Sequence, residues 1–164
     1  MRLAASPKRI SPAVITDDAL TTKELTHISV IPFSTQVNAG ATIAGYLNYS
    51  GEHSASYCVD WQTDDFSTTA VLPTQPLRQT GHFDPRNDNL AGTSGYRPIC
   101  FTDASRQIMA YQADPDTLKT FIDSFYASGY TSIELGSKWG AALLDPSFQP
   151  IVSGMINDDL VVDD

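Results

Sequence analysis

Few residues in this chain have the type and spacing that a reactive site requires. The three histidines, His27, His53 and His82, are far apart in the sequence and lack the spacing of metal ligands, so we expect surface or internally hydrogen-bonded side chains. Adjacent acids occur at positions 64–65 and 158–159, and we expect both pairs to be solvated. Nucleophile-elbow, phosphate-loop and dinucleotide-binding glycine motifs are absent. The sequence therefore predicts that the protein is not an enzyme.

Two short stretches have the look of an oxygen-rich loop for a hard cation. Residues 65–69 read DFSTT, but no apolar strand leads into them. Asp103-Ala104-Ser105 follows an apolar stretch, but its fifth position is Gln107. Short polar side chains of this kind hydrogen-bond to local amides in turns. We therefore interpret both stretches as turn motifs.

The composition limits the classes of partner. The 164 residues, 41% of them hydrophobic, are enough for one domain with a core. Ten basic residues stand against 19 acidic ones, a net charge of −9, which argues against nucleic acid and anionic membrane surfaces. The sequence contains no apolar run of about 18 residues, so we expect no membrane span within it. Residues 1–18 lack the apolar core of a signal peptide, and a signal or anchor is expected outside this chain.

The two cysteines, Cys58 and Cys100, lie in a stretch rich in turn signals. A disulfide between them would close a loop of about 42 residues and contribute about 4 kcal/mol in the chain-entropy model. The alternative is a pair of buried free thiols. We predict the disulfide, because this stretch needs a covalent link and the spacing is not that of a metal site.

The stretch that follows position 113 predicts a helix with a well-defined start. Asp114 is a suitable N-cap and Pro115 suits the first helical position. Apolar residues then recur at spacings of three and four, which indicates one buried face, at Leu118, Phe121, Ile122 and Phe125. Gly129 suits the left-handed conformation that ends a helix.

A second helix is expected directly afterwards. Thr131 and Glu134 have the spacing of a capping box, in which each side chain satisfies a free backbone amide. Gly136 and Gly140 lie about one turn apart and allow a neighbouring segment to approach closely. The Asp-Pro pair at 145–146 is expected to end this helix.

Two strands precede these helices. Residues 26–33 and 107–112 have the composition or alternation of strands, and residues 40–105 between them are dense in turn signals and aromatic residues. We interpret residues 40–105 as a loop-rich insertion with a few short hairpins, within a single partial domain that spans residues 1–164. A short strand is expected at 151–152, and one or two helical turns within 17–25. Strand, crossover, strand, helix, helix is typical of part of a parallel α/β sheet, and two strands are too few to complete one.

Two blocks of the sequence resemble one known family. Residues 30–40 (VIPFSTQVNAG) and 118–146 (LKTFIDSFYASGYTSIELGSKWGAALLDP) are similar to the von Willebrand factor A-like domain of TadG-type proteins of the tight-adherence (Flp) pilus assembly system. The resemblance implies an α/β, Rossmann-like fold and a metal-ion-dependent adhesion site for Mg²⁺. Of the metal ligands of that site, only the threonine is matched here, by Thr131.

The other ligand segments of the family have no match in the chain. The D-x-S-x-S loop would precede residue 1 and the later aspartate would follow residue 164, so the resemblance implies an internal fragment with an incomplete site. It also implies a protein partner in pilus assembly and a periplasmic or extracytoplasmic location, with an anchor outside this chain.

Two alternatives remain open. One is a small secreted hydrolase or carbohydrate-binding module that uses the aromatic-rich 40–105 segment, including Trp61. The other is a truncated reading frame without independent function.

Overall fold

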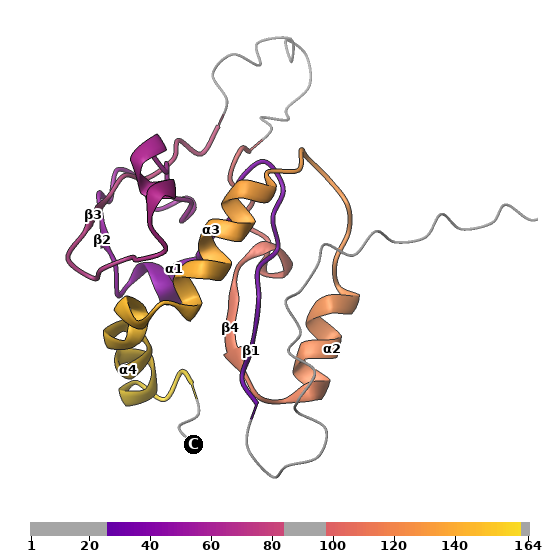
Figure 1. Cartoon of the computed structure of the whole chain (residues 1–164). Helices are drawn as coiled ribbons and strands as arrows, with labels where there is room; N and C mark the ends of the chain where they lie inside the picture. The colour runs from indigo at the N-terminus through magenta and orange to yellow at the C-terminus, as the bar shows by residue number, and fades with distance from the viewer. Residues whose placement is uncertain (1–25, 84–97, 162–164) are drawn as a thin grey trace, which may run out of the picture.

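The computed structural model describes residues 26–83 and 98–161, and the helical turns expected within 17–25 lie outside these ranges. The described chain is a mixed α/β structure with four α-helices and two small sheets (Figure 1). In chain order its strands and α-helices are β1 (Ile28–Val30), α1 (Gly40–Ala44), β2 (Asn48–Tyr49), β3 (Pro76–Leu77), β4 (Met109–Gln112), α2 (Pro115–Asp123), α3 (Ile133–Leu144) and α4 (Gln149–Asn157). Short 3-10 helices occupy Thr63–Ser67, Ala104–Arg106 and Pro146–Phe148.

The two strands expected from the sequence pair with each other, but in the opposite sense to a parallel crossover. β1 and β4 are antiparallel, with Val30 opposite Met109 and Ile28 opposite Gln112. The chain bends after β1, where Ser34 N donates to Gln36 O over 3.2 Å. It then runs parallel to the segment that enters β4, as the bridge between Asn38 and Gln107 shows. The reversal at this bend is the reason that β4 runs against β1.

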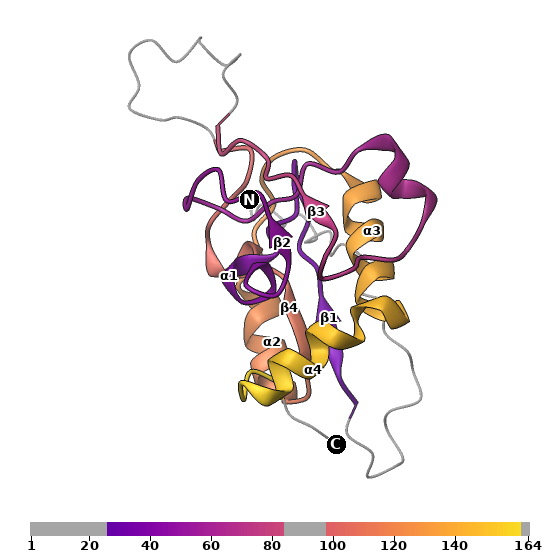
Figure 2. The same ribbon diagram turned by 90° about the vertical axis from the view of Figure 1, so that its left-hand side faces the viewer.

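The helices lie on different sides of this strand pair. In Figure 1, α2 lies to the right of β1 and β4, whereas α1, α4, β2 and β3 lie to the left. After a 90° turn, α4 crosses in front of the two strands (Figure 2). None of the helices in the described ranges has the length and apolar character needed to cross a membrane.

Helix α2 begins as the sequence predicts and ends earlier. The Asp114 side chain accepts a hydrogen bond from Thr117 N over 2.7 Å, and Pro115 is the first helical residue. The helix stops at Asp123, where the Ser124 hydroxyl donates to Phe121 O. Within this helix, Leu118 is the buried residue of the expected apolar face.

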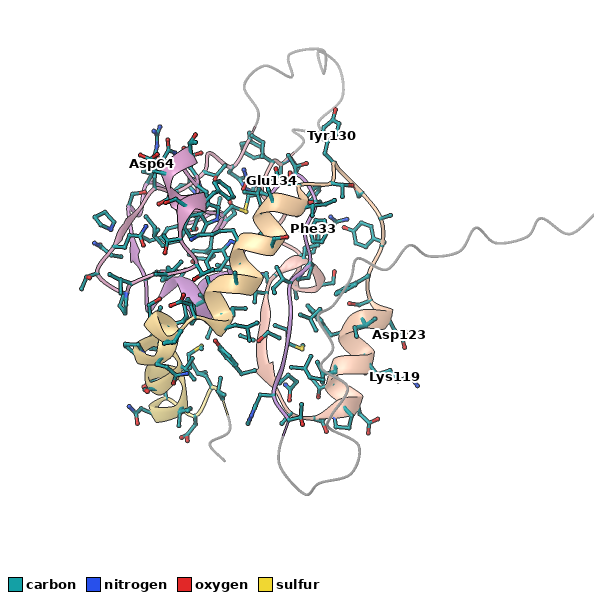
Figure 3. All side chains as sticks on the ribbon, viewed as in Figure 1. Phe33, Asp64, Lys119, Asp123, Tyr130 and Glu134 are labelled. Atoms are coloured by element: carbon teal, nitrogen blue, oxygen red, sulfur yellow. A yellow bond between two sulfur atoms is a disulfide. The ribbon has the colours of Figure 1, made fainter. Side chains whose placement is uncertain are left out.

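Helix α3 packs against the chain that continues β1, and its two glycines permit the close approach. A methyl group at Gly136 would lie 2.8 Å from Cδ1 of Phe33, whereas one at Gly140 would lie 3.6 Å from Cδ1 of Ile31. The sequence predicts that these glycines allow a neighbouring backbone to approach closely, but the atoms nearest to them belong to the side chains of Phe33 and Ile31. Phe33 lies beside α3 in Figure 3.

The strand expected at 151–152 is wrong, because these residues lie within helix α4. Ile151 and Met155, four residues apart, are both 1% exposed. The same face includes Gly154, where an added methyl would lie 2.7 Å from Cε1 of Tyr46. Buried residues four positions apart are typical of a helix. A sequence window that covers only the two β-branched residues at 151–152 misses this spacing.

The hydrophobic core unites the 40–105 segment with the helices that follow it. Ile43, Val59 and Val71 from that segment are at most 2% exposed, like Phe148 after α3. They belong to one cluster, together with Val37, Ala39, Leu47, Trp61, Leu77, Ile108, Trp139, Ala142, Leu143, Ile151 and Met155. The 40–105 segment therefore contributes to the main core instead of forming a separate local one.

The predicted cystine is present, whereas the predicted hairpins are largely replaced by other pairings. Cys58 and Cys100 form a disulfide and are 0% exposed. The two-residue strands β2 and β3 pair in parallel, which a hairpin cannot do. Antiparallel contacts within 40–105 are single bridges, such as Val59 with Gln79.

Asn38 joins several of these irregular segments. Its side-chain Nδ2 donates to Phe101 O over 2.7 Å, and its Oδ1 accepts from Gly40 N over 2.9 Å. Its backbone forms bridges to Cys58 on one side and to Gln107 on the other. Asn38 is 3% exposed, so it connects the cystine to the start of β4 from within the core.

The two glycines of α3 provide a matched test of this packing. We expect Gly140→Ala to raise the free energy of unfolding by up to about 1 kcal/mol, because alanine is the better helix former and space is available. Gly136→Ala should instead lower it by about 1 kcal/mol or more, because the Phe33 ring must move. Urea unfolding of both variants measures the difference. An equal gain in both would contradict the packing described here.

Candidate functional site

The loop between α2 and α3 contains Thr131 and is anchored beside the end of β1. Ser132 N donates to Ser34 O over 2.8 Å, and the Ser132 hydroxyl donates to Thr35 O over 3.1 Å. Tyr130 N donates to the Thr35 hydroxyl oxygen over 3.4 Å. Both neighbours of Thr131 are thus held against the chain that leaves β1, and Thr131 is exposed between them.

The predicted capping box of Thr131 and Glu134 is wrong. Helix α3 begins at Ile133, so its N-cap is Ser132, which makes no side-chain cap hydrogen bond. The Ser132 hydroxyl is directed to Thr35 O instead. A tertiary hydrogen bond has therefore replaced the local one, and Thr131 lies just outside the helix.

Gly129 adopts the left-handed conformation that its position predicts, with φ of 84°. A methyl group there would lie 3.2 Å from the Thr35 hydroxyl oxygen and 3.3 Å from Cβ of Ser34. Both the backbone conformation and the tight contact favour glycine. Gly129 thereby lets the loop approach the residues that follow β1.

Arg106 fixes the other end of this loop. Its guanidinium carbon lies 4.2 Å from the ring centres of both Phe101 and Tyr126. Its Nη2 donates to Tyr126 O over 3.2 Å and its Nη1 to Ser128 O over 3.5 Å. The Arg106 side chain is only 10% exposed. Sequence analysis missed this role, since the arginine and the loop are separated by the whole of β4 and α2.

Three large hydrophobic side chains are exposed along this stretch. Tyr126 is 56% exposed, Tyr130 82% and Ile133 62%. We call these three residues the α2–α3 rim. Tyr130 points away from the ribbon at the top of the loop in Figure 3. Exposed aromatic and aliphatic groups on an anchored loop are typical of a surface that contacts another protein.

The two aspartate motifs have different roles. Asp65 accepts hydrogen bonds from Gln62 N over 2.8 Å and from Gln75 Nε2 over 3.1 Å, which confirms that it is a turn motif. Asp103 makes no local cap. The stretch is nevertheless a turn, in which Arg106 N donates to Asp103 O over 2.9 Å. The Asp103 side chain accepts a hydrogen bond from the Tyr126 hydroxyl over 3.2 Å and pairs with Arg106 instead of bonding a local amide.

The described groups near Thr131 are neutral oxygens. Ser34, Thr35 and Ser132 supply neutral hydroxyl and carbonyl oxygens. Those that form hydrogen bonds do so with other groups of this loop and of the chain after β1. Mg²⁺ in proteins is usually bound through one or two carboxylates. Within residues 26–83 and 98–161, no group of three or more His, Cys, Asp or Glu side chains could hold a metal ion.

The structure brings together two histidines that the sequence places far apart. The ring centres of His53 and His82 are 6.2 Å from each other. The pKa of His82 is lowered mainly by the burial of its ring and secondly by the charge of the neighbouring His53. His27 precedes β1 and lies elsewhere in the chain. No short-range pattern signals this pair, because it depends on the pairing of the 53–58 and 79–83 segments.

Lys138 is a buried cation on α3 that the sequence analysis did not identify. It is 5% exposed, and its Nζ donates to Thr68 O over 2.7 Å. Burial lowers its pKa, and the carboxylates of Asp65 and Asp145 act in the opposite direction. Its ammonium group also lies 5.1 Å from the ring centre of Trp61. Lys138 thus ties α3 to the residues around Thr68.

The adjacent acids do not form a paired catalytic site. Asp64 lies on the exposed 3-10 helix Thr63–Ser67 (Figure 3), whereas its neighbour Asp65 caps that helix. Asp158 accepts a hydrogen bond from the Tyr46 hydroxyl, and Asp159 has a positive φ of 57°. The hydrogen bond to Asp158 is the main cause that raises the pKa of Tyr46.

Comparison with protein-family models, curated proteins and solved structures found no match to this chain.

Replacement of Arg106 tests whether this side chain holds the loop. We expect Arg106→Met to lower the free energy of unfolding by about 1–3 kcal/mol, because two ring contacts and two charged hydrogen bonds are lost. Amide exchange of Tyr130 and Ser132 should accelerate. Lys119→Met, on the outer side of α2 (Figure 3), is the control and should change stability by less than about 0.5 kcal/mol. Unchanged exchange in Arg106→Met would show that the loop is held by other contacts.

Proposed function

We propose that this chain is a non-enzymatic interaction module of an envelope-anchored pilus assembly protein, and that it contacts a partner protein through the α2–α3 rim. The observation that carries the proposal is the exposure of Tyr126, Tyr130 and Ile133 on one anchored stretch. Tyrosine and aliphatic anchors supply much of the energy of protein interfaces. The net charge of −9 favours a protein partner over nucleic acid.

The anchoring of the rim supports this function. Ser132 is bonded to the chain after β1, and Arg106 holds Tyr126 and Ser128. A loop that is already ordered loses less conformational entropy when it binds. The exposed side chains are therefore presented in a preorganised arrangement.

The family resemblance extends the proposal to the fold. We infer an incomplete Rossmann-like domain of the von Willebrand A type, related to that of TadG-type proteins. One contact supports it: the residues around Thr131 lie against the chain that leaves β1. The antiparallel pairing of Val30 with Met109 departs from the parallel sheet expected of such a domain. The Mg²⁺ site that the resemblance implies would need carboxylate ligands in addition to Thr131, and we propose that segments outside this chain supply them.

The cystine supports a periplasmic or other extracytoplasmic location. Disulfides persist in oxidising compartments and are rare in reducing ones. Cys58 and Cys100 are both buried and joined. The proposed location also fits a pilus assembly partner outside the cytoplasm.

The carbohydrate-binding alternative relied on Trp61, whose ring is not accessible to a sugar. Trp61 is 8% exposed and packs edge-to-face on Trp139, with ring centres 5.4 Å apart. A sugar ring cannot stack on a face that another indole and Lys138 occupy. No other feature of the described residues favours a hydrolase, so we advance the interaction module alone.

Binding to isolated tight-adherence pilus filaments tests the rim directly. In surface plasmon resonance we expect saturable binding of this chain, weakened at least about tenfold by Tyr130→Ala, since interface tyrosines contribute about 2 kcal/mol or more. Phe66→Ala is the matched control, because Phe66 is an exposed aromatic residue of another surface (42% exposed). An absence of binding, or equal weakening by both variants, would contradict the proposal.

Calorimetry with Mg²⁺ tests the incomplete metal site. We expect this chain to show only weak, non-stoichiometric heats, because too few charged oxygen ligands surround Thr131. Thr131→Ala and the control Thr42→Ala, on an exposed position of α1, should behave like the parent. Stoichiometric binding that Thr131→Ala abolishes would show that a complete site exists in the chain.

A further inference from the structure

Gln79 is a buried amide whose orientation is fixed by backbone groups. It is 2% exposed. Its Oε1 accepts from His53 N over 3.1 Å, and its Nε2 donates to His53 O over 2.9 Å and to Ser56 O over 2.6 Å. If the amide were reversed, its NH₂ group would face the donor His53 N, and its oxygen would face the acceptors His53 O and Ser56 O. The Nε2 group of Gln79 is therefore always a donor here.

The orientation of Gln79 dictates the protonation state of His53. Nε2 of the imidazole lies 2.9 Å from Thr80 O, and a carbonyl oxygen only accepts, so this nitrogen carries hydrogen. Nδ1 lies 3.2 Å from Gln79 Nε2, which only donates, so this nitrogen must be bare. The two hydrogens of Gln79 Nε2 are directed at His53 O and Ser56 O, so Nδ1 faces a nitrogen that cannot accept a hydrogen bond, and the neutral Nε2–H tautomer is the one that fits these contacts. Protonation of Nδ1 would place two donors against each other.

A second imidazole strengthens this preference for the neutral state. His82 lies 6.2 Å from His53 between ring centres, and its Nδ1 is 3.0 Å from the Ser56 hydroxyl oxygen. The Ser56 hydroxyl can donate or accept, so it suits either state of His82. Two imidazolium rings at this separation would repel. A charge on His53 therefore disfavours a charge on His82.

Within the described residues no carboxylate compensates these rings. The titratable group that faces each of them is the other histidine. Their other partners, Ser56, Gln79 and Thr80, are neutral. Among the described residues, the nearest charged side chains in the sequence are Glu52 and Arg78, both exposed, and Arg78 pairs with Asp60 at 3.6 Å. Asp84, two positions after His82, lies outside the described ranges.

We propose that His53 and His82 form an acid-sensitive clasp, which holds residues 53–56 against residues 79–82 at neutral pH and loosens when the rings are protonated. The clasp is independent of the proposed binding function. Its release affects the chain on both sides of the cystine, because Thr80 N donates to Cys58 O over 2.9 Å and Ile99 N to His82 O over 2.9 Å.

The direction of the pH effect follows from the lowered pKa of His82. The unfolded chain, with a histidine pKa of about 6.5, takes up protons before the folded chain does. The stabilising effect of the neutral clasp is complete above that value and declines as the pH falls toward the lower pKa of the folded state. Carboxylates mostly titrate below this window.

Thermal unfolding at about pH 7.5 and about pH 5.0 tests the clasp, since histidine is the side chain that ordinarily titrates between them. We compare the parent chain, His27→Gln as matched control and the double variant His53→Gln/His82→Gln. On acidification the parent and the control should lose at least about 3 °C more in melting temperature than the double variant, because only they contain both rings of the clasp. An equal loss in all three would overturn the proposal.

Nitrogen-15 NMR of the histidine rings in the parent chain gives a readout that does not depend on the variants. At neutral pH the His53 ring should show the Nε2–H tautomer. As His53 and His82 are protonated, the amide signals of His53, Ser56 and Thr80 should shift together. An Nδ1–H tautomer of His53, or protonation that leaves these amides unchanged, would also overturn the proposal.

Discussion

The hydrogen bonds of Asn38 join segments of the described structure that no strand ladder connects. The strands of the structure are short, so most of the chain must satisfy buried backbone groups by other means. Asn38 does so for several segments at once: its side chain bonds Phe101 and Gly40, and its backbone contacts Cys58 and Gln107. It directs the chain after β1 back alongside the approach to β4. The cystine then locks two of the segments that meet at this residue.

Features with a local cause were predictable from the sequence. The start of α2 depends on Asp114 and Pro115 alone, and the left-handed turn at Gly129 on a residue without a side chain. The glycines of α3 indicated that another part of the chain packs closely on this helix, and the side chain of Phe33 does so. For the helix start and the left-handed turn, the physical reason lies within a few residues of the feature. The identity of the neighbour of the glycines, by contrast, depends on a distant part of the chain.

Features with a distant cause were missed or misjudged. Ser132 gives its hydroxyl to Thr35 rather than to its own helix, so the capping box was wrong. Arg106 holds a loop beyond α2, and Gln79 brings two histidine segments together. The antiparallel sense of β1 and β4 follows from a bend that no motif marked. Three-dimensional contacts decided each of these, and local pattern carries no information about them.

The cystine also has a consequence for the covalent integrity of the chain. Cys58 and Cys100 are 42 positions apart, so a single peptide-bond cut anywhere between them leaves both products joined through sulfur. The nicked molecule keeps its mass, apart from one added water, until a reductant separates the two pieces. Core residues on either side of the cut, such as Val59 and Trp139, would remain tethered near one another. A protease that reaches this span therefore opens a ring without releasing a fragment.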